Sequence, residues 1–399
     1  MIAVSLTRPQ DYQQALRSGA DYVELRTDYF TDQQLKHFVE HSTLPVIYTI
    51  KRPTAYLPKV AYVDIDDQSK QHLSGKVIRS FHDYKRTPHF STLNQLVQSI
   101  LKQKSIPKIA THVQTVADLY TLARLQKKYG KKIIVVGMGE LGMMTRVYNK
   151  SLLTYASVSR AATTATGQLT MKEMKTTQLF GLVGDAIQHS LSPKLHQQFY
   201  RQKHLPYDYQ LWETVDLAKM MFVFDFFELP GASVTKPFKR QVMQYCDQID
   251  RHAKKIGAVN TVVRRGNTLL GYNTDWLGVQ NSIGRYLTGK RVLILGRGGT
   301  AKAIAYAAKQ AGSKKITMLG HQQLPTSTTD YDVVVNATPV GDQLLVPANS
   351  LKGKVVMDCI YGQQTELLKQ ARYNGAKVVL DGLPMLRYQA TEQFRLMKV

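Results

Sequence analysis

The chain has 399 residues, of which 43% are apolar, and a formal net charge of +24 at pH 7. This length suffices for two or three domains, and no run approaches the roughly 18 to 20 apolar residues that a membrane-spanning helix needs. The two cysteines, Cys246 and Cys359, lie far apart without CxxC spacing, so neither a disulfide framework nor a metal site is expected. The N-terminus enters a strand-like run without a signal pattern, and we expect a cytoplasmic protein.

The positive charge is spread along the chain. Residues 1–175 contain 25 Lys and Arg against 13 Asp and Glu, and the remainder contains 28 against 16. Binding of nucleic acid is the main alternative that such a charge raises, but a basic arm would concentrate the charge in one part. The even distribution favours a generally basic surface that attracts anionic carboxylates and phosphates. We therefore expect small-molecule partners and no nucleic acid.

Eight short β-rich runs lie between residue 1 and about residue 161, with helical segments between many of them. They are IAVSLT, YVELRTD, VIYTIK, AYVDID, KVIRSFHD, KIATHV, IIVVGMG and ASVSRA. This pattern predicts a (β/α)8 barrel, a compact one because typical barrels need about 250 residues. The links after the third and fourth strands are too short for full helices. Residues 163–178 are polar, and we expect them to run from the last barrel loop into a linker.

A second α/β unit begins at LFGLVGD, a strand that enters a glycine turn. Ser192 and Pro193 suit the N-cap and first position of the helix that follows. Strands and helices alternate to about residue 283, where a dinucleotide-binding unit begins with VLILG. In that unit the segment after KKITMLG is too short and too rich in Thr and Pro for a full helix. The segment at 384–397 is helical and is expected to pack back on the preceding domain.

The turn after VLILG has the pattern that a dinucleotide requires. Gly296 permits a tight turn, Gly298 permits close approach of the backbone to a pyrophosphate, and Ala301 stands at the third glycine position. Before this turn, Lys239, Asn260 and Asp275 stand in short apolar segments, where polar groups without partners are costly. A polyhydroxylated ligand would supply those partners, with Lys239 giving a proton to an oxygen that gains charge. The combination predicts carbonyl reduction by hydride.

These motifs resemble two enzyme families. Residues 179–399 resemble shikimate dehydrogenase through HSLSP, VTKPFK, GAVNT, YNTDWLG, GRGGTAKA, NATPVG, DGLPML and YQA, in that order. Residues 1–178 are similar to a shortened type I 3-dehydroquinate dehydratase through VELRTD, SFHDYKRTP, IPKIA, a late Arg146 and ATGQ. The two enzymes catalyse consecutive steps of the shikimate pathway, and the order of the two parts resembles that of bifunctional dehydratase-dehydrogenases.

The resemblance implies three domains: a barrel at 1–175, a substrate domain at 176–282 completed by 383–399, and a Rossmann-like domain at 283–382. Lys239 and Asp275 would form the catalytic pair of the dehydrogenase. Its substrate would meet Ser190, Ser192, Thr235, Asn260, Tyr361 and Gln389. Its cofactor would meet Gly296, Arg297, Gly298, Gly299, Thr300, Ala301, His321 and Gly382.

In the barrel, the resemblance makes Lys108 the lysine that forms an imine with the substrate and His82 the general acid and base. Covalent catalysis needs a neutral amine, and we expect a basic, partly desolvated pocket to lower the pKa of Lys108. Glu24 would orient the imidazole of His82. Arg26 would hold Glu24 or the ligand.

Two further barrel residues are implied, and several departures accompany them. Arg146 would pair with the substrate carboxylate, and Gln168 would close the site from the last loop. The arginine of the family's third strand is replaced by YTIKRP, where Lys51 or Arg52 could substitute, and the glycine-rich loop that follows is missing. Thr164 stands where a serine is expected. With the short barrel, these departures leave an inactive barrel domain as an alternative.

The choice of nicotinamide cofactor is not determined by the residues alone. The second strand of a dinucleotide fold normally ends in an acid for NAD or near an arginine for NADP. Here it ends in Gly320 and His321. NADP is implied by the resemblance, with Arg297, Lys302 and His321 as candidate partners of the extra phosphate, and NAD stays the alternative.

The sequence as a whole predicts a bifunctional enzyme. The barrel would dehydrate 3-dehydroquinate to 3-dehydroshikimate through an imine on Lys108, and the C-terminal part would reduce this product to shikimate with NADPH. Ser233 and Lys236 depart from the dehydrogenase pattern and could shift its substrate preference. The alternatives are a shikimate or quinate dehydrogenase with an inactive barrel and a basic nucleic-acid-binding protein.

Overall fold

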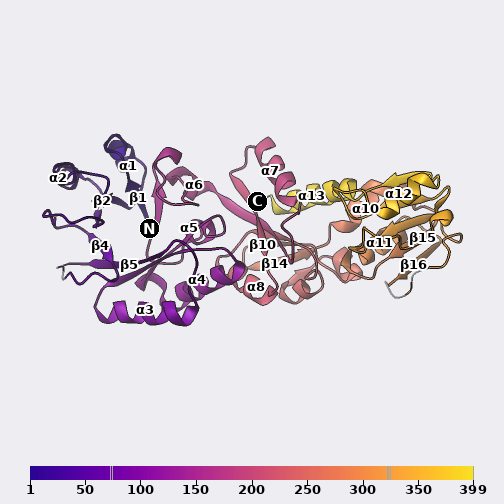
Figure 1. Ribbon diagram of the computed structural model, residues 1–399, viewed down its shortest axis with the longest axis horizontal. Coiled ribbons are helices and arrows are strands. Elements are labelled where there is room, and N and C mark those ends of the chain that lie inside the picture. Colours follow the sequence, from indigo (N-terminus) through magenta and orange to yellow (C-terminus); the bar gives the residue numbers. More distant parts are fainter. Residues whose placement is uncertain (72, 74, 321–322, 324, 399) are drawn as a thin grey trace. The chain divides into compact units, whose positions relative to one another are not determined.

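The computed structural model describes residues 1–71, 73, 75–320, 323 and 325–398. Its chain divides into two compact units, and many of their elements are labelled in Figure 1. The first unit joins Met1–Phe180 with His204–Leu229, and the second joins Gly181–Lys203 with Pro230–Val399.

The first unit contains a sheet of eight parallel strands in the order β7-β6-β5-β4-β3-β2-β1-β8. The strands are β1 (Ile2–Leu6), β2 (Tyr22–Arg26), β3 (Val46–Thr49), β4 (Tyr62–Asp66), β5 (Val77–Asp83), β6 (Ile106–His112), β7 (Ile134–Met138) and β8 (Thr154–Ser157). Because β7 and β8 approach each other at the seam, the sheet is nearly closed. The predicted (β/α)8 barrel is confirmed.

The helices of the barrel are unequally distributed. They are α1 (Tyr12–Leu16), α2 (Asp32–His41), α3 (Phe90–Lys102), α4 (Val116–Tyr129), α5 (Met143–Val147) and α6 (Met171–Thr176). In the part of the chain that the structure describes, no α-helix joins β3 to β4 or β4 to β5, as the short links predicted. The expected linker at 163–178 instead contains α6, because Thr170 and Glu173 form a capping box that starts a helix there.

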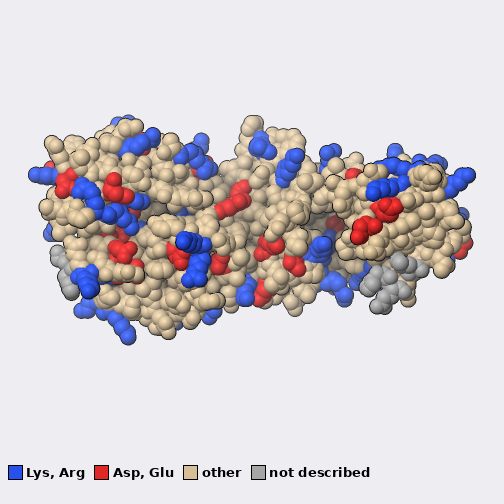
Figure 2. Space-filling view, in the orientation of Figure 1, with Lys and Arg blue, Asp and Glu red and all other residues tan. Residues whose placement is uncertain are grey.

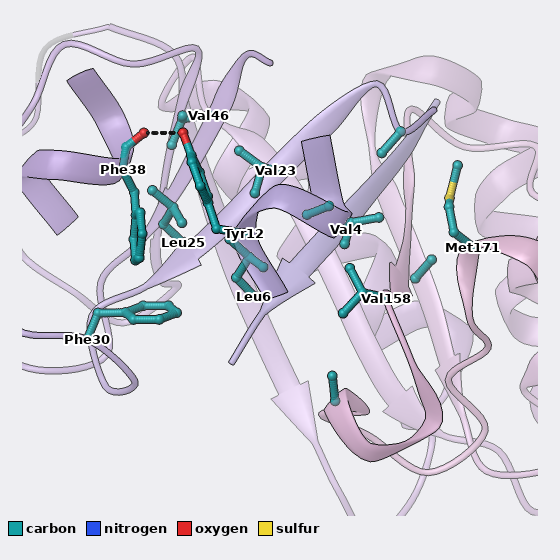
Figure 3. Packing of buried hydrophobic residues seen from close by; sticks show 14 of the residues in the cluster. Val4, Leu6, Tyr12, Val23, Leu25, Phe30, Phe38, Val46, Val158 and Met171 are labelled. Atoms are coloured by element: carbon teal, nitrogen blue, oxygen red, sulfur yellow. Dashed lines mark hydrogen bonds between the residues drawn. The ribbon is translucent and has the colours of Figure 1, made fainter. Parts of the chain in front are cut away.

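Two apolar layers hold the barrel together. The outer layer packs one face of the strands against the helices, and Figure 3 shows Val4, Leu6, Val23 and Leu25 in it. Within this layer the hydroxyl of Tyr12 donates a hydrogen bond of 3.0 Å to the carbonyl of Phe38. The inner layer fills the barrel with residues from the other face of the strands: Ala3, Ile47, Tyr62, Ile78, Ala110, Ile134, Val136, Leu153 and Tyr155.

A six-stranded mixed sheet has the order β10-β9-β11-β13-β14-β12. Its strands are β9 (Gln178–Gly184), β10 (Tyr207–Glu213), β11 (Gly231–Val234), β12 (Gln248–Ile249), β13 (Thr261–Arg265) and β14 (Thr268–Tyr272). The helices of this region are α7 (Ser192–Gln202), α8 (Leu217–Phe226), α9 (Arg251–Ile256), α10 (Asp275–Ile283) and α13 (Leu383–Met397). Leu191 is the N-cap of α7 and Ser192 its first residue, one position from the prediction.

The strand β10 and the helix α8 belong to the compact unit of the barrel. The rings of Tyr120 on α4 and Phe222 on α8 lie 5.1 Å apart and nearly perpendicular, and the Lys127 ammonium lies 4.9 Å from the centroid of the Phe222 ring. The side-chain amide of Gln210 donates to the carbonyl of Glu140 at 3.1 Å. Aromatic and cation–π contacts of this kind add to the stabilisation from buried area.

A five-stranded parallel sheet with the order β16-β15-β17-β18-β19 completes the second unit. Its strands are β15 (Arg291–Leu295), β16 (Lys315–Leu319), β17 (Val333–Asn336), β18 (Val355–Asp358) and β19 (Val378–Leu380), with helices α11 (Gly299–Gln310) and α12 (Glu366–Tyr373). The strand order places β15 at the crossover, where parallel α/β sheets bind their ligands. Between β16 and β17 the described residues contain no helix, as predicted.

Candidate active sites

A buried ammonium lies inside the barrel. Lys108 on β6 is 6% exposed, and its Nζ lies 2.8 Å from Oδ2 of Asp64 and 3.9 Å from Oε1 of Glu24. Its Nζ also lies 4.1 Å from the centroid of the Tyr155 ring. Burial alone lowers the pKa of Lys108, but the carboxylate of Asp64 and the other groups outweigh burial and raise it above the ordinary value. The prediction that the pKa of Lys108 is lowered is therefore wrong, because the charged groups nearest to its ammonium are carboxylates.

The histidine expected beside this lysine is held in its neutral form. Burial, together with the positive charges of Lys108 and Lys51, lowers the pKa of His82 to about 3. Its Nδ1 is buried without a hydrogen-bond partner in the described part of the chain. The ring of Tyr84 stacks on the imidazole at 5.9 Å. A neutral imidazole at physiological pH can accept a proton, as a general base must.

Glu24 and Arg26 bond to partners other than those expected. Glu24 accepts hydrogen bonds from the hydroxyls of Ser5 and Thr49, the latter at 2.9 Å. No hydrogen bond joins Glu24 to His82 among the residues that the structure covers. Arg26 forms an ion pair of 2.8 Å with Asp28. The carboxylate of Glu24 therefore lies between two hydroxyls and the Lys108 ammonium.

The structure distinguishes the two cations that could replace the family's arginine on the third strand. The Arg52 guanidinium pairs with Asp32 at 2.7 Å and donates to the carbonyl of Thr27, also at 2.7 Å. Lys51 is exposed, and its charge lies close enough to His82 to contribute to the lowering of the pKa of that imidazole. Lys51 is thus the cation of this pair whose charge acts on the histidine.

Arg146 and Gln168 are both buried. The guanidinium of Arg146, on α5, donates to the carbonyls of Gly137 and Tyr155 at 3.3 and 3.2 Å, and burial lowers the pKa of Arg146 to about 10. The side-chain oxygen of Gln168 accepts from the amide and hydroxyl of Thr164 at 2.6 and 2.9 Å. The last loop is therefore internally bonded, with threonine in the place of the expected serine.

The second site is a cavity of about 1130 Å³ in the second unit. Its lining includes most residues that the sequence predicted for the dehydrogenase: Ser190, Ser192, Thr235, Lys239, Asn260, Asp275, Gly296, Arg297, Gly298, Gly299, Thr300, Tyr361, Gly382 and Gln389. Ala301 is fully buried under the turn instead. His321 lies outside the described residues. The cavity is large enough for a small ligand together with part of a dinucleotide.

Lys239 and Asp275 form the ionic centre of this cavity. The Nζ of Lys239 lies 2.6 Å from Oδ2 of Asp275, and their side chains are 14% and 6% exposed. The same ammonium donates to the hydroxyl of Thr300 at 3.2 Å. Asp275 begins α10, where the helix dipole favours a negative charge. The lysine is thereby fixed between the cavity wall and the glycine turn.

Asn260 joins the other side of Asp275 to the last helix. Its side-chain nitrogen donates to Oδ1 of Asp275 at 2.8 Å and to the side-chain oxygen of Gln389 at 3.3 Å. Its side-chain oxygen accepts from the backbone amide of Thr274 at 2.8 Å. The amide of Asn260 is therefore locked, and Gln389 on α13 is brought to the same cluster.

Two residues behind this cluster were missed by sequence reasoning. Gln393, on α13, donates to the carbonyl of Asn260 and to the hydroxyl of Thr261, both at 3.1 Å. Its side-chain oxygen lies 3.4 Å from Nε2 of His196, which is fully buried on α7. The spacing of Gln389 and Gln393, four residues apart on one helix face, was the available signal.

The glycine turn is shaped for a phosphate. Gly296 has a φ of +120°, a conformation that favours glycine. A Cβ added to Gly298 would meet nothing within 4 Å, so the backbone there is open to a ligand at the N-terminus of α11. Arg297 donates to the side-chain oxygen of Gln323 at 2.6 Å, and a Cβ on Gly320 would lie 3.7 Å from its side chain. Arg297 thus lies over the end of β16.

Lys302, the other candidate partner of the phosphate, is directed elsewhere. Its Nζ lies 3.8 Å from the place where a Cβ on Gly257 would be, at the end of α9. It does not line the cavity among the residues that the structure describes. This placement leaves Arg297 as the described cation at the end of β16.

Comparisons with known proteins agree with the division of the chain into an N-terminal barrel and a dehydrogenase-like part. Residues 5–180 match the family model of type I 3-dehydroquinase, and residues 182–262 match the shikimate dehydrogenase substrate binding domain. The chain is 34% identical over 244 residues to a shikimate dehydrogenase (NADP(+)) of Pyrococcus furiosus, with 55% of this chain and 90% of that protein covered. The crystal structure of shikimate dehydrogenase from Aquifex aeolicus is 34% identical, with a TM-score of 0.52, and covers 56% of this chain and 92% of its own.

A further relative spans both parts of the chain. It is a bifunctional 3-dehydroquinate dehydratase/shikimate dehydrogenase, chloroplastic, of Arabidopsis thaliana, 29% identical over 476 residues, with 95% of this chain and 77% of that protein covered. The fold and the cavity define a two-part enzyme of the dehydroquinase and dehydrogenase classes. The chain belongs to the shikimate dehydrogenase family and carries a type I 3-dehydroquinase barrel before it. The resemblance seen in the sequence is confirmed.

The described part of the chain contains neither a membrane-spanning helix nor a group of side chains that could bind a metal ion. Over the described ranges, every helix is too short or too polar to cross a membrane. Within those ranges no group of three or more His, Cys, Asp or Glu side chains is arranged to hold a metal ion.

The buried His196 predicts a dependence of stability on pH. Burial lowers its pKa to about 4 from 6.5, so the unfolded chain takes up a proton first as the pH falls. This contribution to stability is complete above about pH 6.5 and is lost toward pH 4, by up to about 1.4 kcal/mol per pH unit. Urea unfolding at pH 7 and pH 5 should therefore show a smaller loss of stability in His196→Gln than in the unmodified chain. Equal losses in both proteins would contradict the prediction.

Proposed function

We propose that this chain catalyses two consecutive reactions of the shikimate pathway, dehydration of 3-dehydroquinate to 3-dehydroshikimate and NADPH-dependent reduction of that product to shikimate. The observation that carries the proposal is one lysine in each unit, buried in the barrel and half-buried in the cavity, whose amine is paired with a carboxylate at 2.8 Å in the barrel and 2.6 Å in the cavity. Two amines of this kind suit the two reactions, an imine in the first and proton delivery in the second.

In the barrel, Lys108 is the proposed nucleophile and His82 the proposed acid and base. An iminium on Lys108 would withdraw electrons from the neighbouring carbon and so acidify its C–H bond. His82, whose pKa lies far below 7, would take that proton and then return it to the hydroxyl that leaves as water. The neutral state of His82 supports this assignment.

Other barrel residues would bind and orient the substrate. We assign its carboxylate to Arg146, whose guanidinium donates hydrogen bonds to two backbone carbonyls and forms no ion pair with a carboxylate among the described residues. Lys51 is proposed as the second cation of the site, and Gln168 as its closing residue. Glu24 is proposed to orient groups around Lys108 through its own hydroxyl partners. Arg26, bound to Asp28, would act on the ligand only after release from that pair.

In the cavity, Lys239 is the proposed proton donor. The carbonyl oxygen of the substrate gains negative charge as the ketone is reduced, and an ammonium in a partly dry site stabilises and then protonates it. Asp275 would hold the ammonium and accept from a substrate hydroxyl. Ser190, Ser192, Thr235, Asn260, Tyr361 and Gln389 are the proposed partners of the substrate carboxylate and the remaining hydroxyls.

NADPH, when bound, supplies the hydride for this reduction. The open backbone at Gly298 and the N-terminus of α11 fit a pyrophosphate, with Gly296, Gly299 and Thr300 in the same turn. Arg297 is proposed to bind the extra phosphate, because it lies over the end of β16, where dinucleotide folds read that group. Gly382 lines the cavity where a side chain would collide with the carbonyl of Cys359.

We also propose the domain boundaries, partners and location that the sequence predicted. The boundaries are 1–175, 176–282 with 383–399, and 283–382. Cytoplasmic location is supported by the two free cysteines, which suit a reducing compartment. Small anionic partners, and not nucleic acid, are supported by Figure 2, where Lys and Arg are scattered over the visible face with Asp and Glu among them.

Replacement of Lys239 tests the reduction step. Lys239→Ala should lower the single-turnover rate of NADPH oxidation with 3-dehydroshikimate by about 10²-fold to 10⁴-fold, because the charged proton donor is lost. The affinity for NADPH, measured by fluorescence titration, should stay within about threefold. Lys255→Ala, an exposed lysine of α9, should leave both quantities unchanged. A near-normal rate in Lys239→Ala would refute its role.

Trapping with borohydride tests the dehydration step. The protein treated with 3-dehydroquinate and borohydride should gain the mass of the reduced adduct on the peptide that contains Lys108, because an imine is reduced irreversibly to an amine. Lys108→Ala should give no adduct, whereas Lys102→Ala, an exposed lysine of α3, should react normally. An unmodified Lys108 under turnover conditions would remove the imine mechanism.

Replacement of Arg297 tests the cofactor assignment. Arg297→Ala should raise KM for NADPH by roughly tenfold or more, because a charge-assisted hydrogen bond is worth about 1.5 to 3 kcal/mol. KM for NADH, which lacks the extra phosphate, should hardly change. Arg285→Ala, an exposed arginine after α10, is the control. A similar rise for both cofactors would mean that Arg297 does not bind the phosphate.

A further inference from the structure

Asp64 is a buried acid of the barrel that the sequence did not single out. It lies on β4, is 1% exposed, and uses both carboxylate oxygens. Oδ1 accepts a hydrogen bond from the hydroxyl of Ser80, and Oδ2 accepts from Nζ of Lys108 at 2.8 Å. One oxygen is thus fixed by a neighbouring strand, and the other is directed at the amine.

The charges around Lys108 create a difficulty for imine formation. One ammonium lies beside two buried carboxylates, those of Asp64 and Glu24, at 2.8 and 3.9 Å. The carboxylates favour the protonated amine, which has no lone pair and cannot attack a ketone. Before Lys108 reacts, its proton must therefore move to an acceptor that is already in contact with it.

We propose that Asp64 accepts the proton of Lys108 when the imine forms. Asp64 then returns this proton to the former carbonyl oxygen of the substrate, which leaves as water when the imine is completed. This inference rests on the proposed dehydratase function. Lys108 as –NH₃⁺ gives one proton to Asp64, and the neutral amine forms a bond to the ketone carbon. A proton moves from nitrogen to the former carbonyl oxygen. Asp64 then protonates that hydroxyl, the C–O bond breaks, and water leaves the iminium. Ammonium and ketone have become iminium and water, and Asp64 is a carboxylate again.

The contacts favour Asp64 over the other two candidate acceptors. Glu24 is 1.1 Å farther from the amine, as the two distances of 2.8 and 3.9 Å show, and its oxygens already accept from Ser5 and Thr49. His82 has no hydrogen bond to Lys108 within the described residues. Its proposed task, moreover, is at the carbon next to the iminium. Asp64 is the group with an oxygen at hydrogen-bond distance from the reacting nitrogen.

The burial of Asp64 suits a group that holds a proton for a short time. Taking a carboxylate out of water raises the free energy of its charged form, and among the described residues the Ser80 hydroxyl and the Lys108 ammonium donate the hydrogen bonds that compensate here. When Lys108 becomes neutral, Asp64 loses its counter-charge at the moment it receives the proton. The pair therefore exchanges an ion pair for two neutral groups without leaving an isolated buried charge.

Asp64→Asn separates proton transfer from electrostatics. The amide has nearly the same size and can still accept from Ser80, but it cannot take the proton. Without the carboxylate the amine becomes neutral more easily, so an electrostatic role alone predicts equal or faster imine formation. Our proposal predicts imine formation slower by about 10²-fold or more, measured at pH 7 by rapid mixing with 3-dehydroquinate and quenching with borohydride.

Two further variants complete the experiment. Asp64→Glu restores an acid, and its imine should form at least about tenfold faster than that of Asp64→Asn. Asp66→Asn removes the next acid of β4, which is exposed, and should react like the unmodified protein. Imine formation in Asp64→Asn at or above the normal rate would overturn the proposal, and so would equal slowing in Asp64→Asn and Asp64→Glu. An adduct that persists in Lys108→Ala would instead overturn the proposed function.

Discussion

The structure depends on two pairs of a lysine and an aspartate that are largely withdrawn from water. An isolated charge in such a place is expensive, and a pair is tolerated only when further hydrogen bonds satisfy the remaining oxygens. Both pairs meet this condition with neutral donors. In the barrel a serine hydroxyl bonds to Asp64, and in the cavity the amide of Asn260 bonds to Asp275. The surrounding polar side chains are therefore needed to keep each amine in place.

The two parts of the chain position their amines by different means. In the barrel, β-strand alternation directs every second side chain inward, so that Asp64 and Ser80 follow Tyr62 and Ile78 along their strands toward the interior. In the second unit the groups come from a loop, a helix N-terminus and the last helix, α13, which returns to contribute Gln389. The first arrangement depends on the register of a sheet, and the second on the return of the chain's end.

Much of this was visible in the sequence, for reasons that can be stated residue by residue. The eight strands, the absent helices and the glycine turn follow from periodicity and from local chemistry at positions such as Gly296. The lining of the cavity followed from ordered motifs. The environment of Lys108 did not, because its neighbours Asp64 and Tyr155 come from strands that are distant in sequence. Asp64, in YVDID, has the alternation of an ordinary strand whose acids face solvent, as Asp66 does. The capped α6 was missed because its polar composition hides the pairing of Thr170 with Glu173.

The hydrogen bond from Lys239 to Thr300 has a wider consequence. The group that would deliver a proton and the loop that would cradle a dinucleotide share one anchoring hydroxyl, and the methylene stem of the lysine lies directly against Gly299. A side chain in place of Gly299 would press on that stem, which carries the ammonium that pairs with Asp275. Substitutions in this turn are therefore limited by two requirements, the binding of the dinucleotide and the position of the Lys239 ammonium.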